Sequence, residues 1–107
     1  MATTKVLGQS YPSAATATTL YTASTSAGTV VSTINAANTS STADTIRIAV
    51  RPAGATLANQ HYLAYNVGVP ANGQYAFTAG VTLANTDVIT IYSTNGTCAF
   101  SAFGQEQ

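Results

Sequence analysis

His61, the only histidine of the chain, is the residue around which hydrolytic chemistry could be built. A catalytic triad would combine it with a carboxylate, from Asp44 or Asp87, and with a nucleophile such as Cys98 or a serine. However, the Gly-x-Ser-x-Gly pattern of a nucleophile elbow does not occur. Cys98 also alternates with Phe100 in an expected strand, and a free cysteine usually behaves as a small buried hydrophobe. The pattern therefore favours a structural role for Cys98.

Metal and cofactor sites have equally little support. One histidine and one cysteine cannot complete a tetrahedral zinc site, and three scattered carboxylates do not build an oxygen cage. Asp44, Asp87 and Glu106 are also the only candidates for a pair of glycosidase carboxylates, and Glu106 lies in an expected frayed tail. No glycine-rich phosphate loop is present. We therefore predict that the chain is not an enzyme and needs no metal or cofactor.

Charge is scarce in this sequence. The 107 residues include three basic and three acidic side chains, 6% in all, and the formal net charge is zero. A soluble globular domain usually has about 25% charged residues. A net charge near zero favours association, and neutral hydroxyl and amide groups must wet most of the surface. This composition predicts a protein that is largely covered by neighbouring subunits, rather than a freely diffusing enzyme.

The same composition argues against nucleic acid and membrane partners. Lys5, Arg47 and Arg51 are the only strong cations, too few for a nucleic-acid or anionic-lipid footprint. No apolar run approaches the roughly 18 residues that a membrane span needs. Residues 1–5 show no apolar segment of a secretory signal. Because the lone Cys98 is consistent with a reducing compartment, we expect the chain to be made in a cytoplasm.

The local pattern predicts strands along almost the whole chain. β-Branched and aromatic residues fit a pleated surface, and no segment keeps helical spacing of apolar residues between two caps. In the clearest strand, Ile46, Ile48 and Val50 alternate with a more polar face. Asn95-Gly96 is a tight-turn signal, so the last two strands are expected to form a hairpin. The eight expected strands are residues 5–11, 18–22, 28–38, 46–51, 59–69, 74–82, 87–94 and 97–103.

Eight short antiparallel strands bury their apolar faces most simply as two packed sheets. We therefore predict one all-β domain over residues 1–107, an antiparallel β-sandwich of the jelly-roll or the immunoglobulin type, which share these local signals. Val88 and Ile89 are adjacent and cannot both face inward on one regular strand. The expected core contains Val6, Leu20, Val30, Ile34, Ile46, Ile48, Val50, Leu63, Phe77, Leu83, Val88, Ile89, Ile91 and Phe100.

A few side chains are candidates for contact with another protein. Arg47 and Arg51 share one face of a strand, about 13 Å apart. They either form part of a solvated outer face or anchor a neighbouring subunit, since arginine is enriched at interfaces. Tyr62 and Tyr65 are expected on opposite faces of their strand, and an outward tyrosine offers apolar area with a polar tip. The candidate interface residues are Arg47, Arg51, His61 and Tyr65.

Several segments resemble a widespread group of small virion proteins of tailed bacteriophages. They are residues 5–9 (KVLGQ), 46–54 (IRIAVRPAG), 59–65 (NQHYLAY) and 83–92 (LANTDVITIY), and the similarity covers residues 5–103. Members of this group are described as virion structural proteins, and some small β-domains of this kind cement or decorate capsids. The resemblance implies a virion setting and carries over no catalytic residue.

These observations together lead to one functional hypothesis and one alternative. We expect a non-enzymatic phage virion structural protein, a capsid cement or decoration protein that bridges and stabilises major capsid subunits. Its partners would be the major capsid protein or another virion protein, together with further copies of the chain, a trimer being one candidate assembly. The alternative is a tail, fibre or head-knob domain that binds the host surface or a glycan, although the chain has no tryptophan.

Overall fold

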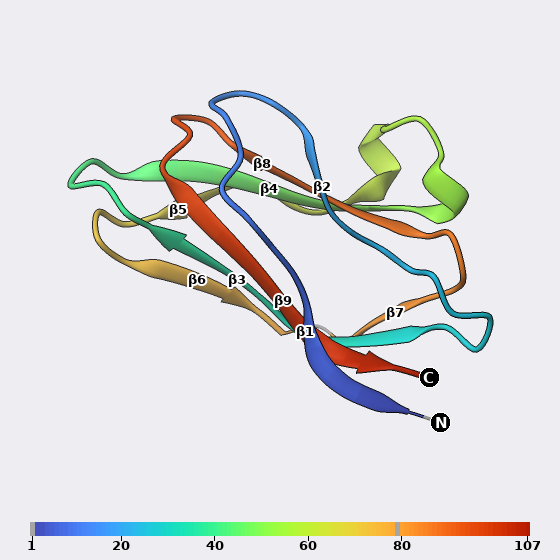
Figure 1. Cartoon of the computed structure of the whole chain (residues 1–107). Helices are drawn as coiled ribbons and strands as arrows, with labels where there is room; N and C mark the ends of the chain where they lie inside the picture. Colours follow the sequence, from blue (N-terminus) through green and yellow to red (C-terminus); the bar gives the residue numbers. More distant parts are fainter. Residues whose placement is uncertain (1, 79) are drawn as a thin grey trace.

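The structure, a computed structural model, describes residues 2–78 and 80–107 and consists of two antiparallel sheets packed face to face (Figure 1). The expected all-β sandwich is confirmed. Two single-turn 3-10 helices, η1 (Pro52–Gly54) and η2 (Asn59–His61), lie between the fourth and fifth strands. The described residues form nine strands: β1 (Thr3–Ser10), β2 (Thr18–Thr22), β3 (Thr29–Asn38), β4 (Asp44–Arg51), β5 (Tyr62–Val69), β6 (Gln74–Phe77), β7 (Val81–Leu83), β8 (Val88–Ser93) and β9 (Cys98–Glu106).

The strand pairings are those of one long antiparallel hairpin rolled into a sandwich. β1 pairs with β9, β2 with β8, β3 with β6 and β7, and β4 with β5. The turn of this long hairpin is therefore the β4–β5 connection, which contains η1 and η2. Sheet A has the order β1-β9-β3-β6, with β7 also beside β3, and sheet B has the order β2-β8-β4-β5. Because β6 and β7 pair with successive parts of β3, they are the two halves of the expected strand 74–82. The resulting eight strand positions form a jelly roll, which decides between the two expected sandwich types.

The expected hairpin of the last two strands is wrong. β8 lies in sheet B and β9 lies in sheet A, so the Asn95-Gly96 turn crosses from one sheet to the other. Side chains, rather than a facing strand, accept the amide hydrogens of this turn. Asn95 N donates to Asp44 Oδ1 at 2.9 Å, and Gly96 N donates to Ser93 Oγ at 3.1 Å. An Asn-Gly pair reverses the backbone locally, but it does not select the partner strand.

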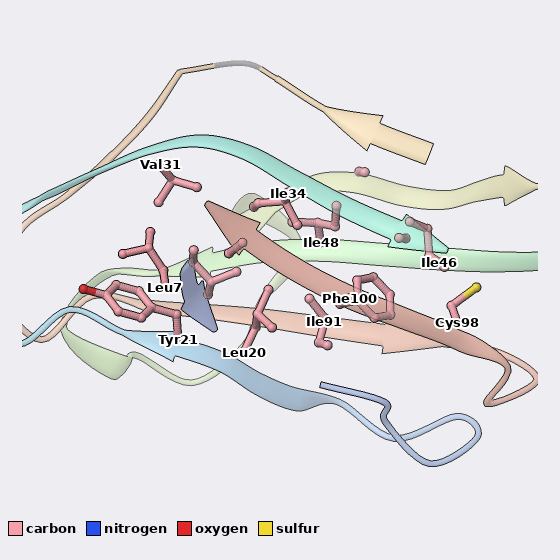
Figure 2. Close-up of a cluster of buried hydrophobic side chains, with 14 of the residues drawn as sticks. Leu7, Leu20, Tyr21, Val31, Ile34, Ile46, Ile48, Ile91, Cys98 and Phe100 are labelled. Atoms are coloured by element: carbon pink, nitrogen blue, oxygen red, sulfur yellow. The ribbon is translucent and has the colours of Figure 1, made fainter. Parts of the chain in front are cut away.

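The core lies between the two sheets and takes side chains from both (Figure 2). Val50 and Phe77 are half-buried and pack against it. Val88 and Ile89 are both buried, because Ile89 faces the core while Val88 lies under Gly54 of η1 on the outer face of sheet B. The other expected residues found in the core are Leu20, Ile34, Ile46, Ile48, Leu83, Ile91 and Phe100.

A β-bulge in β3 overturns the expected burial of Val30. The pairing of β3 with β9 shifts between Val31 and Thr33, so one extra residue interrupts the alternation of the strand. Counting back from the buried Ile34 in steps of two would turn Val30 inward. The bulge turns Val31 inward instead and leaves Val30 exposed.

Bulges in β1 and β5 overturn the expected burial of Val6 and Leu63 in the same way. The register of β1 against β9 shifts between Val6 and Gly8, and Leu7 takes the buried position. The register of β5 against β4 also shifts, so Ala64 faces the core and Leu63 is exposed. One inserted residue is enough to exchange the two faces of a strand.

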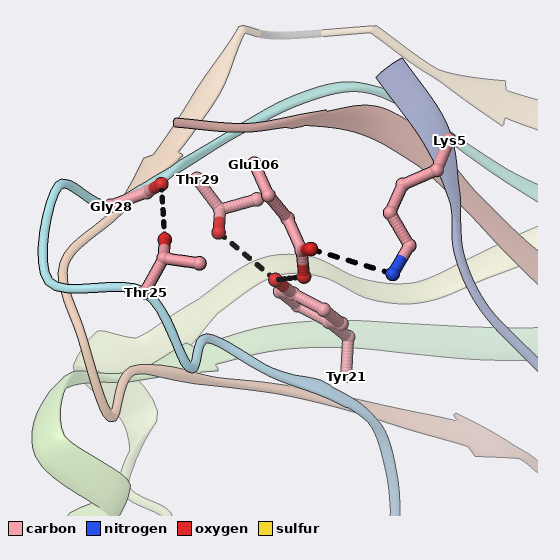
Figure 3. Close-up of polar contacts among 6 residues, drawn as sticks. All are labelled: Lys5, Tyr21, Thr25, Gly28, Thr29 and Glu106. Carbon is pink, nitrogen blue, oxygen red and sulfur yellow. Dashed lines mark hydrogen bonds and ion pairs between the residues drawn. The ribbon is translucent and has the colours of Figure 1, made fainter. Parts of the chain in front are cut away.

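Tyr21 ties the two sheets together at the end of the sandwich where the C-terminal strand finishes (Figure 3). Its Oη, on β2, donates to Glu106 Oε2 of β9 at 2.6 Å, and Thr29 Oγ1 lies 2.9 Å from the same hydroxyl. Lys5 Nζ makes an ion pair with Glu106 Oε1 at 3.4 Å. Burial and the bond to Glu106 raise the pKa of Tyr21, while the bond from Tyr21 lowers the pKa of Glu106. Glu106 therefore ends a paired strand, and the expectation of a frayed tail is wrong.

We predict that Val31→Ala lowers the free energy of unfolding by about 2 kcal/mol, because it removes buried methyl groups and leaves a cavity. Val30→Ala, one residue away, should change it by less than about 0.5 kcal/mol, since that side chain is exposed. Urea denaturation followed by circular dichroism measures both values. An equal or larger effect for Val30→Ala would contradict the bulge.

Candidate functional site

A buried carboxylate lies at the end of the sandwich opposite Glu106. Asp44, the first residue of β4, is 3% exposed. Its Oδ1 accepts the amide hydrogens of Thr45 (2.7 Å) and Asn95 (2.9 Å), and its Oδ2 accepts the Ser93 hydroxyl and, at 3.4 Å, the Cys98 thiol. Burial alone would raise the pKa of Asp44. These hydrogen bonds outweigh burial and hold the pKa of Asp44 below its usual value.

Asn38, the last residue of β3, extends this network to further loops. Its Nδ2 donates to the carbonyl oxygens of Thr42 (2.9 Å), Val69 (3.4 Å) and Pro70 (3.3 Å). Its Oδ1 accepts the Thr97 hydroxyl at 3.0 Å. The network thus joins the β3–β4 loop, the β5–β6 connection and the β8–β9 turn. Its role is to hold the connections between the sheets.

Cys98 is not an activated nucleophile. It is fully buried on β9, as expected from its alternation with Phe100. Burial and the neighbouring Asp44 carboxylate raise the pKa of Cys98 to about 12, so the thiol stays protonated. Within residues 2–78 and 80–107, no three His, Cys, Asp or Glu side chains lie close enough together to hold a metal ion.

Two of the expected interface residues, His61 and Arg51, are used inside the fold. His61 is buried at the end of η2, where its Nδ1 accepts the backbone N–H of Ala58 at 3.0 Å. In the described part of the chain, no hydrogen bond joins His61 to a carboxylate, a hydroxyl or a thiol. Arg51 donates from Nε to Thr90 Oγ1 at 2.9 Å and from a terminal nitrogen to Ala55 O at 3.1 Å. Both side chains fix the β4–β5 connection and its surroundings.

The other two expected interface residues, Arg47 and Tyr65, meet on the outer face of sheet B. The guanidinium carbon of Arg47 lies 4.4 Å from the ring centroid of Tyr65 and 4.2 Å from that of Tyr92. Both contacts are cation–π interactions. Arg47 Nε also donates to Asn66 Oδ1 at 2.8 Å. The arginine therefore fixes the ring of Tyr65, which remains exposed to solvent.

Tyr62 and Tyr65 lie on the same face of β5, contrary to the expectation that they face opposite sides. Tyr62 pairs with Ala49 of β4 and Ala64 pairs with Ile48, the next residue of β4, so β5 contains one extra residue between these two pairs. This bulge turns both tyrosines outward. Their ring centroids are 4.9 Å apart and the ring planes make an angle of 78°. Together with Asn59 of η2 they line an open hollow of about 330 Å³. Counting in steps of two along the sequence misses this pair, because the bulge reverses the alternation.

The outer face of sheet A carries an apolar patch that was not expected from the sequence. It consists of Val6, Val30 and Phe103, which are 49%, 37% and 38% exposed. These residues belong to the neighbouring strands β1, β3 and β9 and line an open hollow of about 410 Å³. The bulges in β1 and β3 turn the two valines outward beside the phenylalanine. The patch is therefore a direct result of the strand register.

Each of the charged side chains has a polar partner within the fold. Lys5 is paired with Glu106, and both arginines donate hydrogen bonds. Asp44 is surrounded by donors, and Asp87 accepts two backbone N–H groups, each at 2.9 Å. Because the chain has six charged side chains in all, the surface available to solvent and to partners is formed mainly by neutral polar and apolar groups.

Comparison of the chain with protein-family models, curated proteins and solved structures found no match. Among the residues that the structure describes, no helix has the length and apolar character needed to cross a membrane. Functional inference therefore has to start from the contacts and surfaces of the chain itself.

We predict that Asp44→Asn lowers the free energy of unfolding at neutral pH by roughly 2 to 3 kcal/mol, a range typical of hydrogen bonds to a charged group. Because the folded-state pKa of Asp44 is lowered, the carboxylate stabilises the protein above its unfolded-state pKa of about 3.9. This contribution is lost as the pH falls through the folded-state pKa. Urea denaturation at neutral pH and at about pH 3 should show a larger loss on acidification for the wild type than for the variant. Equal acid sensitivity of the two proteins would contradict the assigned role.

We also predict that Cys98 of the native protein does not react with Ellman's reagent at mildly alkaline pH. The thiol is buried and its pKa is about 12, so almost no thiolate is present. The same sample should release one equivalent of chromophore after unfolding in urea, which provides the control. Rapid reaction of the folded protein would show that the thiol is accessible and activated.

Proposed function

We propose that the chain is a non-enzymatic virion structural protein of a tailed bacteriophage and that it cements or decorates the capsid. The observation that supports this most is the scarcity of charge on the surface. The charged side chains are engaged within the fold, while Val6, Val30 and Phe103 form an exposed apolar patch on sheet A. A surface of this kind does little to keep copies apart in solution and is suited to contact with other protein.

Sheet A supplies the face that contacts the major capsid protein or another virion subunit. The apolar patch lies over three neighbouring strands, and the neutral side chains of Thr4, Ser32 and Gln105 line the same hollow together with Lys5. An apolar centre with a rim of hydroxyl and amide groups is the usual anatomy of a protein interface. Many equivalent copies on one particle turn a modest contact of a single domain into strong attachment.

The fold and the sequence resemblance both agree with a virion setting. Jelly rolls are common in viral capsid domains, and they also occur in lectins and cupins. The fold therefore supports the proposal by analogy. The narrower class, tailed-phage virion proteins, comes from the resemblance expected for residues 5–103, for which the comparisons found no matching protein. We further propose that the chain is made in the host cytoplasm, self-associates, with a trimer as one candidate assembly, and has no nucleic-acid or membrane partner.

The position in the particle distinguishes this proposal from its alternative, a tail, fibre or head-knob domain. An image reconstruction of the intact particle should place the domain over junctions between capsid subunits, with sheet A toward the shell. Density for the domain on the tail or fibre alone would replace the capsid proposal by the alternative.

We predict that Phe103→Ser weakens attachment to particles that lack the protein by about tenfold or more, because it removes the largest side chain of the patch. The matched control is Leu63→Ser, which changes a side chain of similar exposure, 42%, on sheet B and should attach like the wild type. Co-sedimentation with the particles measures both, and circular dichroism confirms that both variants are folded. Wild-type attachment of Phe103→Ser would contradict the docking face.

Particles carrying the wild-type protein should retain their genomes to a higher temperature than particles without it, since a cement protein adds contacts between capsid subunits. Particles with Phe103→Ser should behave like those without the protein. Equal heat resistance in all cases would contradict a cementing role.

A further inference from the structure

The open hollow on sheet B has the lining of a small-ligand site. Tyr65 is 54% exposed, and its ring stands at 78° to that of Tyr62. Two rings at nearly a right angle form a corner in which a ligand can lie flat on one ring while its edge touches the other. The volume of about 330 Å³ is near the lower end of small-molecule pockets. The space therefore suits a compact ring rather than a long chain.

The corner is ordered before any ligand arrives. Arg47 packs over the ring of Tyr65 at 4.4 Å and over that of Tyr92 at 4.2 Å, and Asn66 accepts a hydrogen bond from its Nε at 2.8 Å. A side chain that is already fixed loses little conformational entropy when a ligand stacks on it. Arg47 thus acts as a positioning residue for Tyr65.

Asn59 supplies the polar side of the hollow. Its backbone oxygen accepts the N–H of Tyr62 at the end of η2, which fixes the residue beside the rings. Its side-chain amide has no hydrogen-bond partner among the described residues. One acceptor oxygen and two donor hydrogens are therefore open to a ligand.

We propose that this hollow is a carbohydrate site, which stacks the C–H face of a neutral pyranose ring on a tyrosine and hydrogen-bonds its hydroxyl groups to Asn59. A pyranose has an apolar face and a rim of hydroxyl groups, which match the rings and the amide of the corner. An anionic ligand fits less well, because the nearby cation, Arg47, is already stacked and hydrogen-bonded. A nucleic-acid strand fits less well because three cations in the whole chain cannot follow its phosphates.

This inference does not rest on the capsid proposal. The apolar patch lies on the outer face of sheet A, and the hollow lined by Tyr62 and Tyr65 lies on the outer face of sheet B. The two outer faces of a sandwich point in opposite directions. A domain attached through sheet A can therefore keep the corner open to the medium.

The test is a titration of isotope-labelled protein, followed by NMR, with the methyl glycosides of glucose, galactose, mannose and N-acetylglucosamine. Single sugar rings bind weakly, so each titration extends to the hundred-millimolar range. We expect at least one of the four sugars to cause saturable shifts of the Tyr62 and Tyr65 ring signals and of the Asn59 side-chain amide signals.

Variants test whether the NMR shifts arise from sugar binding at the corner. Tyr65→Ala and Asn59→Ala should each weaken the binding by about tenfold, whereas Tyr65→Phe should retain most of it because the ring remains. The matched control is Tyr11→Ala, which removes a tyrosine of similar exposure, 59%, just after β1 and should not change the affinity. Asn59 is exposed on a short turn, so its variant tests the site even where Tyr65→Ala does not fold.

Three results would overturn the inference: no saturable shift with any of the four sugars, shifts confined to other parts of the protein, or equal weakening by Tyr11→Ala and Tyr65→Ala. Shifts of Tyr62 and Tyr65 with purified capsid protein, but with none of the sugars, would also overturn it and assign the hollow to a protein contact. Particle attachment without sugar binding overturns this inference alone. Sugar binding without particle attachment overturns the capsid proposal alone.

Discussion

The strict alternation of a β-strand is interrupted by extra residues in β1, β3 and β5, and these interruptions determine which side chains reach solvent. One inserted residue exchanges the inner and outer faces of everything beyond it. In β1 and β3 the shift turns Val6 and Val30 outward on either side of Phe103. In β5 it brings Tyr62 and Tyr65 onto one face. Both surface features for which we propose a function thus depend on strand register, and the apolar patch also needs Gly104, where a Cβ would collide with the Val30 carbonyl oxygen.

Most of the few charges of the chain stabilise the ends and connections of the sandwich, and Arg47, on the outer face of sheet B, is the exception. Asp44 holds the turn between β8 and β9, Asp87 joins η1 to the β7–β8 loop, and Glu106 joins the two sheets at the opposite end. A buried carboxylate is costly unless donors surround it, and Asp44 has several. The formal net charge of zero leaves little electrostatic repulsion between copies. The scarcity of charge on the two outer faces therefore follows from where most of the charges are placed as well as from their small number.

The sequence predicts those features that depend on local periodicity. Ile46 and Ile48 face the core because an uninterrupted stretch of β4 keeps its period of two, and Cys98 is buried beside Phe100 for the same reason. The jelly-roll pairings could not be predicted, since they join residues at opposite ends of the chain, and the Asn95-Gly96 turn reverses the backbone without choosing a sheet. The bulges are marked only indirectly: the register shifts fall at Gly8 in β1 and beside Asn66, of positive φ, in β5, and such residues permit a bulge without fixing which side chains it turns outward. For the candidate sites, the alternation of β4 places Arg47 on the outer face, but the sequence does not say which of Tyr62 and Tyr65 points outward. The contact of Arg47 with Tyr65 and the pairing of the two tyrosines on one face required the register of β5.

The two proposed surfaces differ in what they can bind, and this difference is consistent with the separate roles that we propose for them on a particle. The patch on sheet A is apolar and spans three strands, so it gains most from burial against another protein surface. The corner on sheet B is small, open and mainly aromatic, with Asn59 as its polar residue, and a shallow site of this kind binds a single sugar ring weakly. Weak binding becomes useful when many copies are held close together, because each further contact then forms at high effective concentration. Attachment of many copies through sheet A would provide that arrangement, and it would explain why a neutral aromatic corner is kept exposed on the face that points away from the shell.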